Sequence, residues 1–388
     1  MTSAFETFTE KAGKVKTPCY IIDTDKLTAN FKNIKEKADN SGLSLLMAMK
    51  GFPLAQAFPF IKPFVEGISA SGLFEAKLGS RLGKEVHIHT PAYKKEDAAE
   101  IAALCDHIVL NSPQQAEVFS GVAGSKNQFA LRLNPEISAV EEAVYNPSGR
   151  YSRFGLTKDM LSKAPSDLMN HISGFHIHAL CGNSSKDFNN LLSAVIEKFS
   201  DFLPSVSWIN LGGGQAFTED DFDFADFQEN LDILHTKYHL KTYIEPCEYL
   251  VMESGFLAVT VLDIVHNEKD IAILDTSLSC HALDVLKNYY QLPVVFPEEC
   301  SGRTEQKTYS YLLAGNSCLA GDVFGEYTFS APLKPGDRII FGDMGSYSFA
   351  QQNYFNGINF PDIAFYSRMS GIKPVKSYTY AEYENIYD

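Results

Sequence analysis

The hydrophobic positions between residues 43 and 247 fall into eight short apolar runs, separated by stretches in which apolar residues recur every three or four positions. The short runs have the length of buried strands, and the intervals have the period of amphipathic helices. Strands and helices that alternate eight times are typical of a (β/α)8 barrel. The eight runs are LSLLMAMK, GISAS, EVHIHTP, HIVLNS, QFALRLNP, SGFHIHA, WINLGGG and KTYIEPC.

The pattern changes after residue 250, where strand-like runs punctuated by Gly and Pro follow one another without helix-like intervals. The run PCYIIDTD at residues 18–25 precedes the first barrel strand and is also strand-like. We therefore expect an α/β protein with two domains. Residues 24–250 form the (β/α)8 barrel, and residues 1–23 and 251–388 form an all-β domain.

Several of the eight runs end in polar residues or in glycine. In a barrel the carboxyl ends of all strands surround one mouth, where barrel enzymes place their chemistry. The sequence thus predicts a pocket that contains a lysine, an arginine, histidine, a glutamate and a glycine turn. The strand-end residues are Lys50, Ser71, His89, Asn111, Ser112, Arg132, Asn134, His178, Gly212 to Gly214 and Glu245.

The composition narrows the classes of ligand and compartment. A net charge of −15 argues against nucleic acid and suits a cationic small molecule, although an acidic surface also simply aids solubility. The seven cysteines are scattered and lack CxxC pairs, so they indicate a reducing compartment rather than disulfides or a zinc site. Without an apolar N-terminal core or a long apolar stretch, we expect no signal peptide, no membrane span and a cytoplasmic protein.

The strand-end groups match the needs of pyridoxal 5'-phosphate. The amine of Lys50 can form an imine with this cofactor. The carboxylate of Glu245 can keep the pyridine nitrogen protonated, and a histidine of FHIHA can lie against the ring. The run LGGGQ at 211–215 can offer backbone N–H groups to the phosphate.

Each of these features also has an ordinary structural explanation. Strand-end lysines are usually solvated, and GGG is more often a flexible turn than a phosphate site. The two HIH runs also fit a metal-dependent barrel hydrolase, because alternate strand residues share a face. The metal ligands would then come from His87, His89, His176 and His178.

Several segments match the motifs of one known family: LMAMKGF, GFHIHALC, LGGG, YIEPCEYL, LDTSLSCHALDVL, AGNSCLAGDVFGEY, DMGSYSF and FNGINFPDI. With them the chain resembles the fold type III, alanine racemase-like pyridoxal-phosphate decarboxylases, which include ornithine and diaminopimelate decarboxylases. It is most similar to the branch of carboxynorspermidine (carboxyspermidine) decarboxylases. The resemblance runs from about residue 17 to residue 355 and implies a barrel with an added β-domain.

The resemblance implies roles for residues of the barrel. Lys50 looks like the Schiff-base lysine, His178 like the residue that stacks on the cofactor ring, and Glu245 like the partner of the pyridine nitrogen. Arg132 resembles the arginine near the cofactor. The glycines Gly212, Gly213 and Gly214 look like the phosphate-binding turn.

It also implies two residues from the β-domain and an assembly. Tyr347 of DMGSYSF matches the tyrosine that reaches the phosphate. Cys318 matches the cysteine that enters the active site from the neighbouring subunit and protonates the carbanion after carbon dioxide leaves. The family therefore implies a homodimer with two shared sites.

Two departures from the wider family favour a polyamine substrate. Where the family has EPGR, this chain has Glu245, Pro246, Cys247 and Glu248, and an acid at the last position suits a cationic substrate tail. Leu319 replaces the acidic residue that follows the cysteine in ornithine and diaminopimelate decarboxylases. Candidates for contact with the ammonium groups of a carboxylated triamine are Glu248, Asp275, His281, Asp284 and Asp322.

These features predict decarboxylation of carboxynorspermidine or carboxyspermidine to norspermidine or spermidine. Two alternatives stay open. One is decarboxylation of diaminopimelate or another basic amino acid. The other is a non-catalytic pyridoxal-binding regulator, against which the presence of both Lys50 and Cys318 speaks.

Overall fold

A computed structural model of the protein describes residues 4–140, 145–165, 167–217, 222–288, 290–297 and 308–388. The contacts divide the chain into two units, residues 30–250 and residues 1–29 with 251–388. The first division falls inside helix α2 (Thr24–Asn40), a few residues beyond the predicted boundary at residue 24. In the part of the chain that the structure describes, no helix has the length and apolarity needed to cross a membrane.

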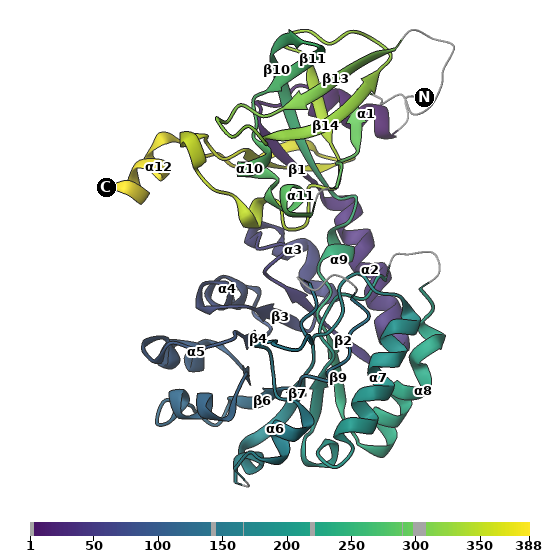
Figure 1. Ribbon diagram of the computed structural model, residues 1–388, viewed down its shortest axis with the longest axis vertical. Helices are drawn as coiled ribbons and strands as arrows, with labels where there is room; N and C mark the ends of the chain where they lie inside the picture. The colour runs from purple at the N-terminus through teal and green to yellow at the C-terminus, as the bar shows by residue number, and fades with distance from the viewer. Residues whose placement is uncertain (1–3, 141–144, 166, 218–221, 289, 298–307) are drawn as a thin grey trace. The chain divides into compact units, whose positions relative to one another are not determined.

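The first unit is a closed barrel of eight parallel strands, which confirms the predicted fold class (Figure 1). Each strand pairs with the next in chain order, and the last pairs with the first through Leu43 and Thr242. The strands are β2 (Leu43–Ala48), β3 (Gly67–Ala70), β4 (Glu85–His89), β5 (His107–Leu110), β6 (Gln128–Arg132), β7 (Ile172–His176), β8 (Trp208–Asn210) and β9 (Lys241–Ile244).

Helices follow the strands and lie outside them, as Figure 1 shows for α4, α5 and α7. The α-helices of this unit, after α2, are α3 (Phe58–Ile61), α4 (Leu73–Gly79), α5 (Ala98–Leu104), α6 (Lys158–Ser162), α7 (Ser185–Phe199), α8 (Gln228–Asp232) and α9 (Glu248–Val251). The predicted helix at SPQQAEVFSGV is a 3-10 helix, Pro113–Phe119.

Helix α7 illustrates why these intervals fold as they do. Ser184 and Asp187 form a capping box, so each side chain accepts a backbone N–H at the start of the helix. One face of the helix is buried through Phe188, Leu192 and Val195, three and four residues apart.

Large side chains fill the barrel interior. Leu46, Val109, Trp208 and Tyr243 belong to one buried cluster inside it. Gly174 makes room for the indole of Trp208, because a Cβ at this glycine would lie 2.1 Å from Trp208 Cε2. The barrel is therefore a packed core, and access for a ligand is at its ends.

The second unit is built on a nine-stranded sheet in which β1 (Cys19–Asp23) is paired on both sides. It runs antiparallel to β10 (Gly255–Asn267) and parallel to β16 (Asp362–Ser367). This assigns the N-terminal strand to the second unit, as the sequence indicated. The other strands are β11 (Lys269–Leu274), β12 (Val294–Phe296), β13 (Tyr309–Ala314), β14 (Val323–Phe329), β15 (Arg338–Phe341) and β17 (Gly371–Lys376).

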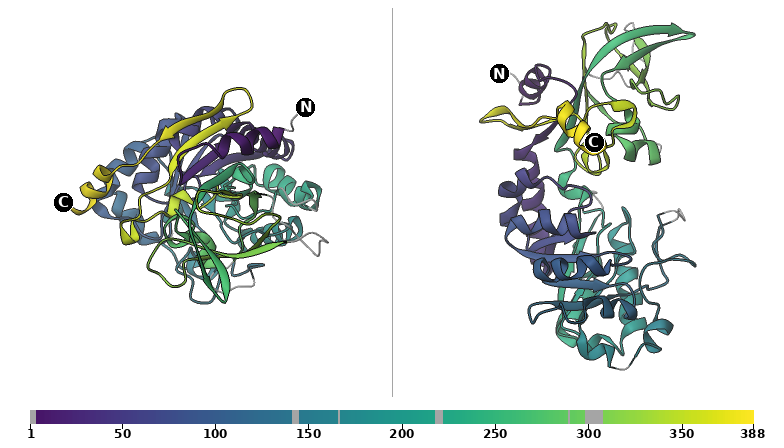
Figure 2. Two further views of the ribbon diagram at one scale, coloured as in Figure 1. Left: turned by 90° about the horizontal axis from the view of Figure 1, so that it is seen from above. Right: turned by 90° about the vertical axis from the view of Figure 1, so that its left-hand side faces the viewer.

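The sheet confirms the predicted β-domain, and the unit also contains helices that the sequence pattern did not predict. Helix α1 (Ala4–Ala12) packs on the β16–β17 hairpin through Phe8 and Tyr366, and Figure 2 shows the purple helix beside the yellow strands. The others are α10 (Leu278–His281), α11 (Leu283–Asn288) and α12 (Tyr380–Tyr387). Helix α10, with four residues, is too short to display a hydrophobic period in the sequence.

Candidate active site

Lys50 follows the end of β2 at the carboxyl end of the barrel. The strand pairing continues one residue beyond β2, since Met49 N–H donates to Ser69 O at 2.9 Å, and the next side chain, Lys50, is exposed. Burial, followed by the positive charges of Lys50 and Arg132, lowers the pKa of His178 well below its usual value. The lysine amine and the histidine ring therefore belong to the same group of side chains.

Glu245 is the centre of a hydrogen-bonded network at this end of the barrel. Its side chain is 11 % exposed, and Oε1 accepts a hydrogen bond from Asn210 Nδ2 at 2.6 Å. His176 Nε2 lies 3.6 Å from Oε2. Burial alone would raise the pKa of Glu245, but His176, His178 and a hydrogen bond from Ser69 outweigh it and lower the pKa. The carboxylate is held ionised inside the barrel.

Arg132 lies beside this network and is buried, with 5 % of its surface exposed. Its guanidinium donates to His178 O at 3.1 Å, lies 3.3 Å from His89 Nδ1, and stacks 4.4 Å from the ring centroid of Phe154. Burial lowers the pKa of Arg132 to about 10 against the opposing charge of Glu245, so the residue remains a cation at neutral pH.

His178 is oriented by the glycine turn. Its Nδ1 accepts the N–H of Gly213 at 2.9 Å, which requires that nitrogen to be unprotonated. The lowered pKa of His178, caused first by burial, keeps the imidazole in this neutral form. The ring is within 12° of parallel to that of His176, at a centroid distance of 6.4 Å. One flat, neutral face is thus fixed at the barrel end.

The turn Gly212 to Gly214 needs glycine for its backbone. Gly212 and Gly214 have φ values of 70° and 90°, and a Cβ at Gly214 would lie 2.2 Å from Leu180 O. Two of the three N–H groups already donate within the protein, that of Gly212 to Asn210 Oδ1 at 2.9 Å and that of Gly213 to His178. This leaves the N–H of Gly214 as the candidate phosphate donor of the turn.

Glu248 lies apart from Glu245 although only two residues separate them. It is exposed and begins α9, whereas the intervening Cys247 is 7 % exposed. The environments of the two carboxylates differ accordingly, one enclosed by donors and one at the surface.

In the second unit, Cys318 is exposed on the loop between β13 and β14, and burial does not restrict its thiol. Asp322 closes this loop from inside and is 3 % exposed. Its Oδ1 accepts the N–H of Leu278 at 2.6 Å and that of Ser279 at 3.4 Å, and its Oδ2 accepts the N–H and the hydroxyl of Ser317. The carboxylate ties the Cys318 loop to the start of α10.

Asp275 and His281 are likewise tied to the protein. Asp275 accepts the hydroxyl of Thr17 at 2.6 Å and the N–H of Thr260 at 2.7 Å. His281 is fully buried with Nδ1 2.8 Å from Thr276 Oγ1, and burial lowers its pKa to about 4. The structure does not bring these two side chains into an exposed group with Cys318.

Asp284 and Tyr347 complete the predicted set. Asp284 is partly exposed on α11, where Gln351 Nε2 lies 3.4 Å from its Oδ1. Tyr347 is half-buried in the loop after β15 and has a left-handed φ of 54°. Such a backbone conformation is costly in a bulky residue and persists only where the surrounding structure supports it.

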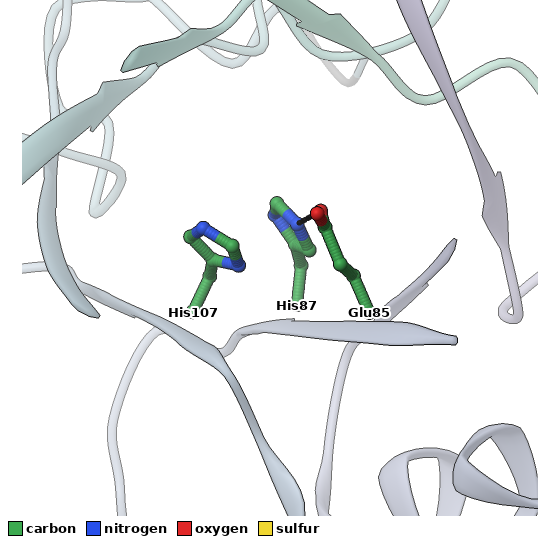
Figure 3. A group of neighbouring side chains, drawn as sticks. All are labelled: Glu85, His87 and His107. Carbon is green, nitrogen blue, oxygen red and sulfur yellow. Dashed lines mark hydrogen bonds and ion pairs between the residues drawn. The ribbon is translucent and has the colours of Figure 1, made fainter. Parts of the chain in front are cut away.

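The histidines of the two HIH runs do not form one group. His89 stacks on His176 at 5.1 Å, whereas His87 stacks on His107 at 3.9 Å and 21° (Figure 3). Glu85, His87 and His107 bring possible ligand atoms within 4.8 Å of one another. Nearly parallel rings direct their in-plane lone pairs side by side rather than to one ion. Glu85 also accepts the hydroxyl of Tyr243 at 2.9 Å. We interpret this group as a packed polar part of the barrel core.

The sequence analysis did not identify three residues, two that contact Glu245 and one that contacts Cys318. Ser69 and Asn210 hold the carboxylate of Glu245, and Asn356 accepts the N–H of Cys318 at 2.7 Å. The signal for Asn210 in the sequence was its place at the end of the apolar run WIN. The residue is fully buried there, and a buried amide requires hydrogen-bond partners.

Comparison with known proteins gives one consistent family. Residues 19–345 match the family described as pyridoxal-dependent decarboxylase, C-terminal sheet domain. Over 378 residues the chain is 35 % identical to the carboxynorspermidine/carboxyspermidine decarboxylase of Campylobacter jejuni, covering 95 % of this chain and 98 % of that protein. Over 380 residues it is 32 % identical to the carboxyaminopropylagmatine decarboxylase of Synechocystis sp., covering 97 % and 96 %.

A solved structure is similar over the same extent. The crystal structure of carboxynorspermidine decarboxylase complexed with norspermidine from Campylobacter jejuni has a TM-score of 0.87 and 34 % identity. The match covers 96 % of this chain and 100 % of that chain.

Proposed function

Because the chain belongs to the pyridoxal-dependent decarboxylases, we propose that it decarboxylates carboxynorspermidine or carboxyspermidine, forming norspermidine or spermidine in polyamine biosynthesis. The observation that carries the proposal is the full-length similarity to enzymes named for these substrates, including the solved relative with bound norspermidine. Membership of the family also replaces the metal-dependent hydrolase, which was the alternative use of the HIH histidines.

The barrel residues fit pyridoxal 5'-phosphate. Gly212 to Gly214 offer a turn that a side chain would fill, and Glu245 is held as an anion. We assign the covalent attachment to Lys50, the ring nitrogen to Glu245, the ring face to His178 and the phosphate to the glycine turn with Tyr347. When bound, the protonated pyridine ring accepts the electron pair that the departing carboxylate leaves. Arg132 is a buried cation, and its charge stabilises the nearby carboxylate of Glu245.

We propose that Cys318 returns the proton to the substrate carbon, and that it comes from the second subunit of a homodimer with two shared sites. The surface around Cys318 supports a covering partner. Leu319 is 42 % exposed and Phe355 is 48 % exposed, and neighbouring exposed apolar side chains are typical of interfaces.

Burial and hydrogen bonding guide which of the acidic candidates we propose as substrate contacts. Asp322 is buried and already accepts four hydrogen bonds, two on each carboxylate oxygen, which leaves no acceptor for a substrate ammonium. Asp275 accepts one hydrogen bond on each oxygen and joins Thr17 to Thr260. His281 is fully buried and neutral. We propose that Glu248, which is exposed, and Asp284, which is partly exposed, contact the cationic chain of the substrate. Charge-assisted contacts of this kind contribute about 1.5 to 3 kcal/mol each.

A second substrate is favoured by a specific comparison. The relative from Synechocystis, 32 % identical over nearly the whole chain, is named for carboxyaminopropylagmatine, whose guanidinium also requires acidic partners. Diaminopimelate is a third candidate, but Leu319 takes the place of the acid expected for it. Carbon dioxide release from each compound, measured at one concentration, ranks the substrates.

The experiment that tests the proposal is an absorption spectrum of the purified protein, recorded with carbon dioxide release before and after carboxynorspermidine is added. We expect a visible cofactor band that is absent from Lys50→Ala, together with release of carbon dioxide. A band without turnover on any of the candidate substrates would contradict the proposed reaction. Absence of a band after reconstitution would contradict the assignment of Lys50.

The cytoplasmic location is also part of the proposal. It rests on the seven scattered cysteines, of which the six in the described residues are free thiols.

A further inference from the structure

The backbone of Cys318 is held by a side chain from a distant part of the sequence. Asn356 Oδ1 accepts the Cys318 N–H at 2.7 Å. The neighbouring N–H groups are held within the loop, that of Leu319 by Ser317 Oγ at 3.3 Å and that of Ser317 by Asp322 Oδ2 at 3.2 Å. Asn356 is therefore the group that fixes the cysteine residue itself from outside its own loop.

Asn356 is itself held in a defined position. Its φ is 58°, a left-handed conformation that asparagine tolerates better than most residues. The preceding residue, Phe355, donates its N–H to Asn353 Oδ1 at 3.0 Å, and Phe355 O lies 3.5 Å from Cys280 Sγ. Asn353 Nδ2 in turn donates to Ser279 O at 2.8 Å.

The same short turn is supported on its other side by aromatic rings. Tyr354 stacks on Phe360 with a centroid distance of 4.0 Å and an interplanar angle of 7°. Tyr383 of α12 meets the Tyr354 ring edge-on at 5.4 Å. Three segments, 276–281, 315–322 and 353–360, thus form one hydrogen-bonded group with Cys318 at its exposed surface.

We propose that Asn356 is a positioning residue for the Cys318 thiol. It acts through the Cys318 backbone, and its amide oxygen limits the directions from which the thiol can deliver a proton. The inference rests on the proposed function, because it assumes that Cys318 is the proton donor. Orientation of a reacting group contributes to rate without contributing to substrate binding, so the effect belongs in kcat.

The test compares Asn356→Gly with Asn356→Asp. Glycine keeps the left-handed backbone and removes the acceptor, whereas aspartate keeps an acceptor of the same size. In Asn356→Gly we expect kcat for carbon dioxide release to fall about five- to tenfold, since a hydrogen bond of this kind is worth roughly 1 kcal/mol. KM and the visible cofactor band stay unchanged, and Asn356→Asp keeps kcat within about threefold of the wild type.

Amide hydrogen exchange of the peptide around Cys318 gives a readout that does not depend on catalysis. Exchange at this peptide becomes faster in Asn356→Gly and stays slow in Asn356→Asp. An unchanged kcat in Asn356→Gly, or equal losses in both variants, would overturn the inference. A Cys318→Ser variant with wild-type kcat would instead refute the proposed role of the cysteine, while the exchange data still report whether Asn356 holds the loop.

Discussion

Glu245 and Glu248 share the segment YIEPCE and differ in what surrounds their carboxylates. Glu245 is enclosed by Asn210, His176 and Ser69, and its pKa is lowered although burial opposes this. Glu248 is exposed. Two acids of the same type and nearly the same position in the sequence therefore suit different tasks, a fixed charge toward the cofactor and contact with a cationic substrate.

This difference predicts that substitutions at the two residues change different kinetic constants, kcat for Glu245 and KM for Glu248. Glu245→Gln replaces a fixed anion by a neutral amide, and we expect kcat to fall by about 100-fold with cofactor still bound. Glu248→Gln should leave kcat unchanged and raise KM for the triamine by about tenfold. Steady-state carbon dioxide release measures both. Wild-type kcat in Glu245→Gln would remove that residue from the site.

Asp322 was predicted as a substrate contact, and its hydrogen bonds indicate a structural role. Asp322→Ala removes an acceptor from Leu278, Ser279 and Ser317 in a buried place, and we expect the free energy of unfolding to fall by about 2 to 4 kcal/mol. KM for the triamine should change less than about twofold. Denaturant unfolding and kinetics of the same variant decide the matter, and a large rise in KM with normal stability would restore the original prediction.

The placement of residues by chain topology was predictable from the sequence, and their contacts with distant partners were not. Lys50, Arg132, His178 and Glu245 meet because the carboxyl ends of barrel strands meet, whatever their sequence spacing. Asp275 looked like a free acid in a loop because nothing in its own segment reveals Thr17, its hydrogen-bond donor. The same limit hid Asn356, which lies far from Cys318 in the sequence.

At the scale of elements, length decided what the sequence revealed. All eight barrel strands were found because each is a continuous apolar run bounded by polar residues. Strand β7 ends at His176, so His178 lies two residues beyond the strand, a boundary that periodicity does not resolve. The short helix α10 belongs to the segment that supports the Cys318 loop, and the sequence pattern did not predict it.

The stacked histidines His87 and His107 in the barrel core predict that the stability of the protein depends on pH. His107 stacks on His87, and burial lowers the pKa of His107 from 6.5 to about 3. Between these values the unfolded state binds a proton that the folded state does not. Stability is therefore complete above about pH 6.5 and decreases as pH falls toward 3, by at most about 1.4 kcal/mol per pH unit for this group.

His107→Phe keeps an aromatic ring against His87 and removes this titration. We expect its free energy of unfolding to decrease less steeply between pH 6.5 and pH 4 than that of the wild type. Parallel slopes for His107→Phe and the wild type would contradict the interpretation.

At the scale of the whole molecule, the two units carry complementary parts of the proposed chemistry. Residues 30–250 hold the cofactor candidates, and the second unit holds Cys318 and Tyr347. The division into a barrel and a β-domain could be predicted from the change of pattern after residue 250. The pairing of β1 on both sides could not, because its partners β10 and β16 are distant in the sequence.

The proposed homodimer with two shared sites predicts complementation between inactive variants. Lys50→Ala and Cys318→Ala lose different groups, and a mixed dimer contains one site with neither change. After subunit exchange in equal amounts, about half of the dimers are mixed, and we expect about a quarter of wild-type activity. Activity no higher than the sum of the separate variants would contradict the shared-site homodimer.

The place of β1 in the second sheet has a consequence for synthesis on the ribosome. Tyr20, Ile21 and Ile22 are fully buried in the finished sheet, but they emerge before any barrel strand, and β10 and β16 are translated only after the barrel strands. The barrel strands follow one another in order and can close while the chain is still being made. An apolar strand thus stays unpaired while the entire barrel is translated, which leaves it open to aggregation during synthesis.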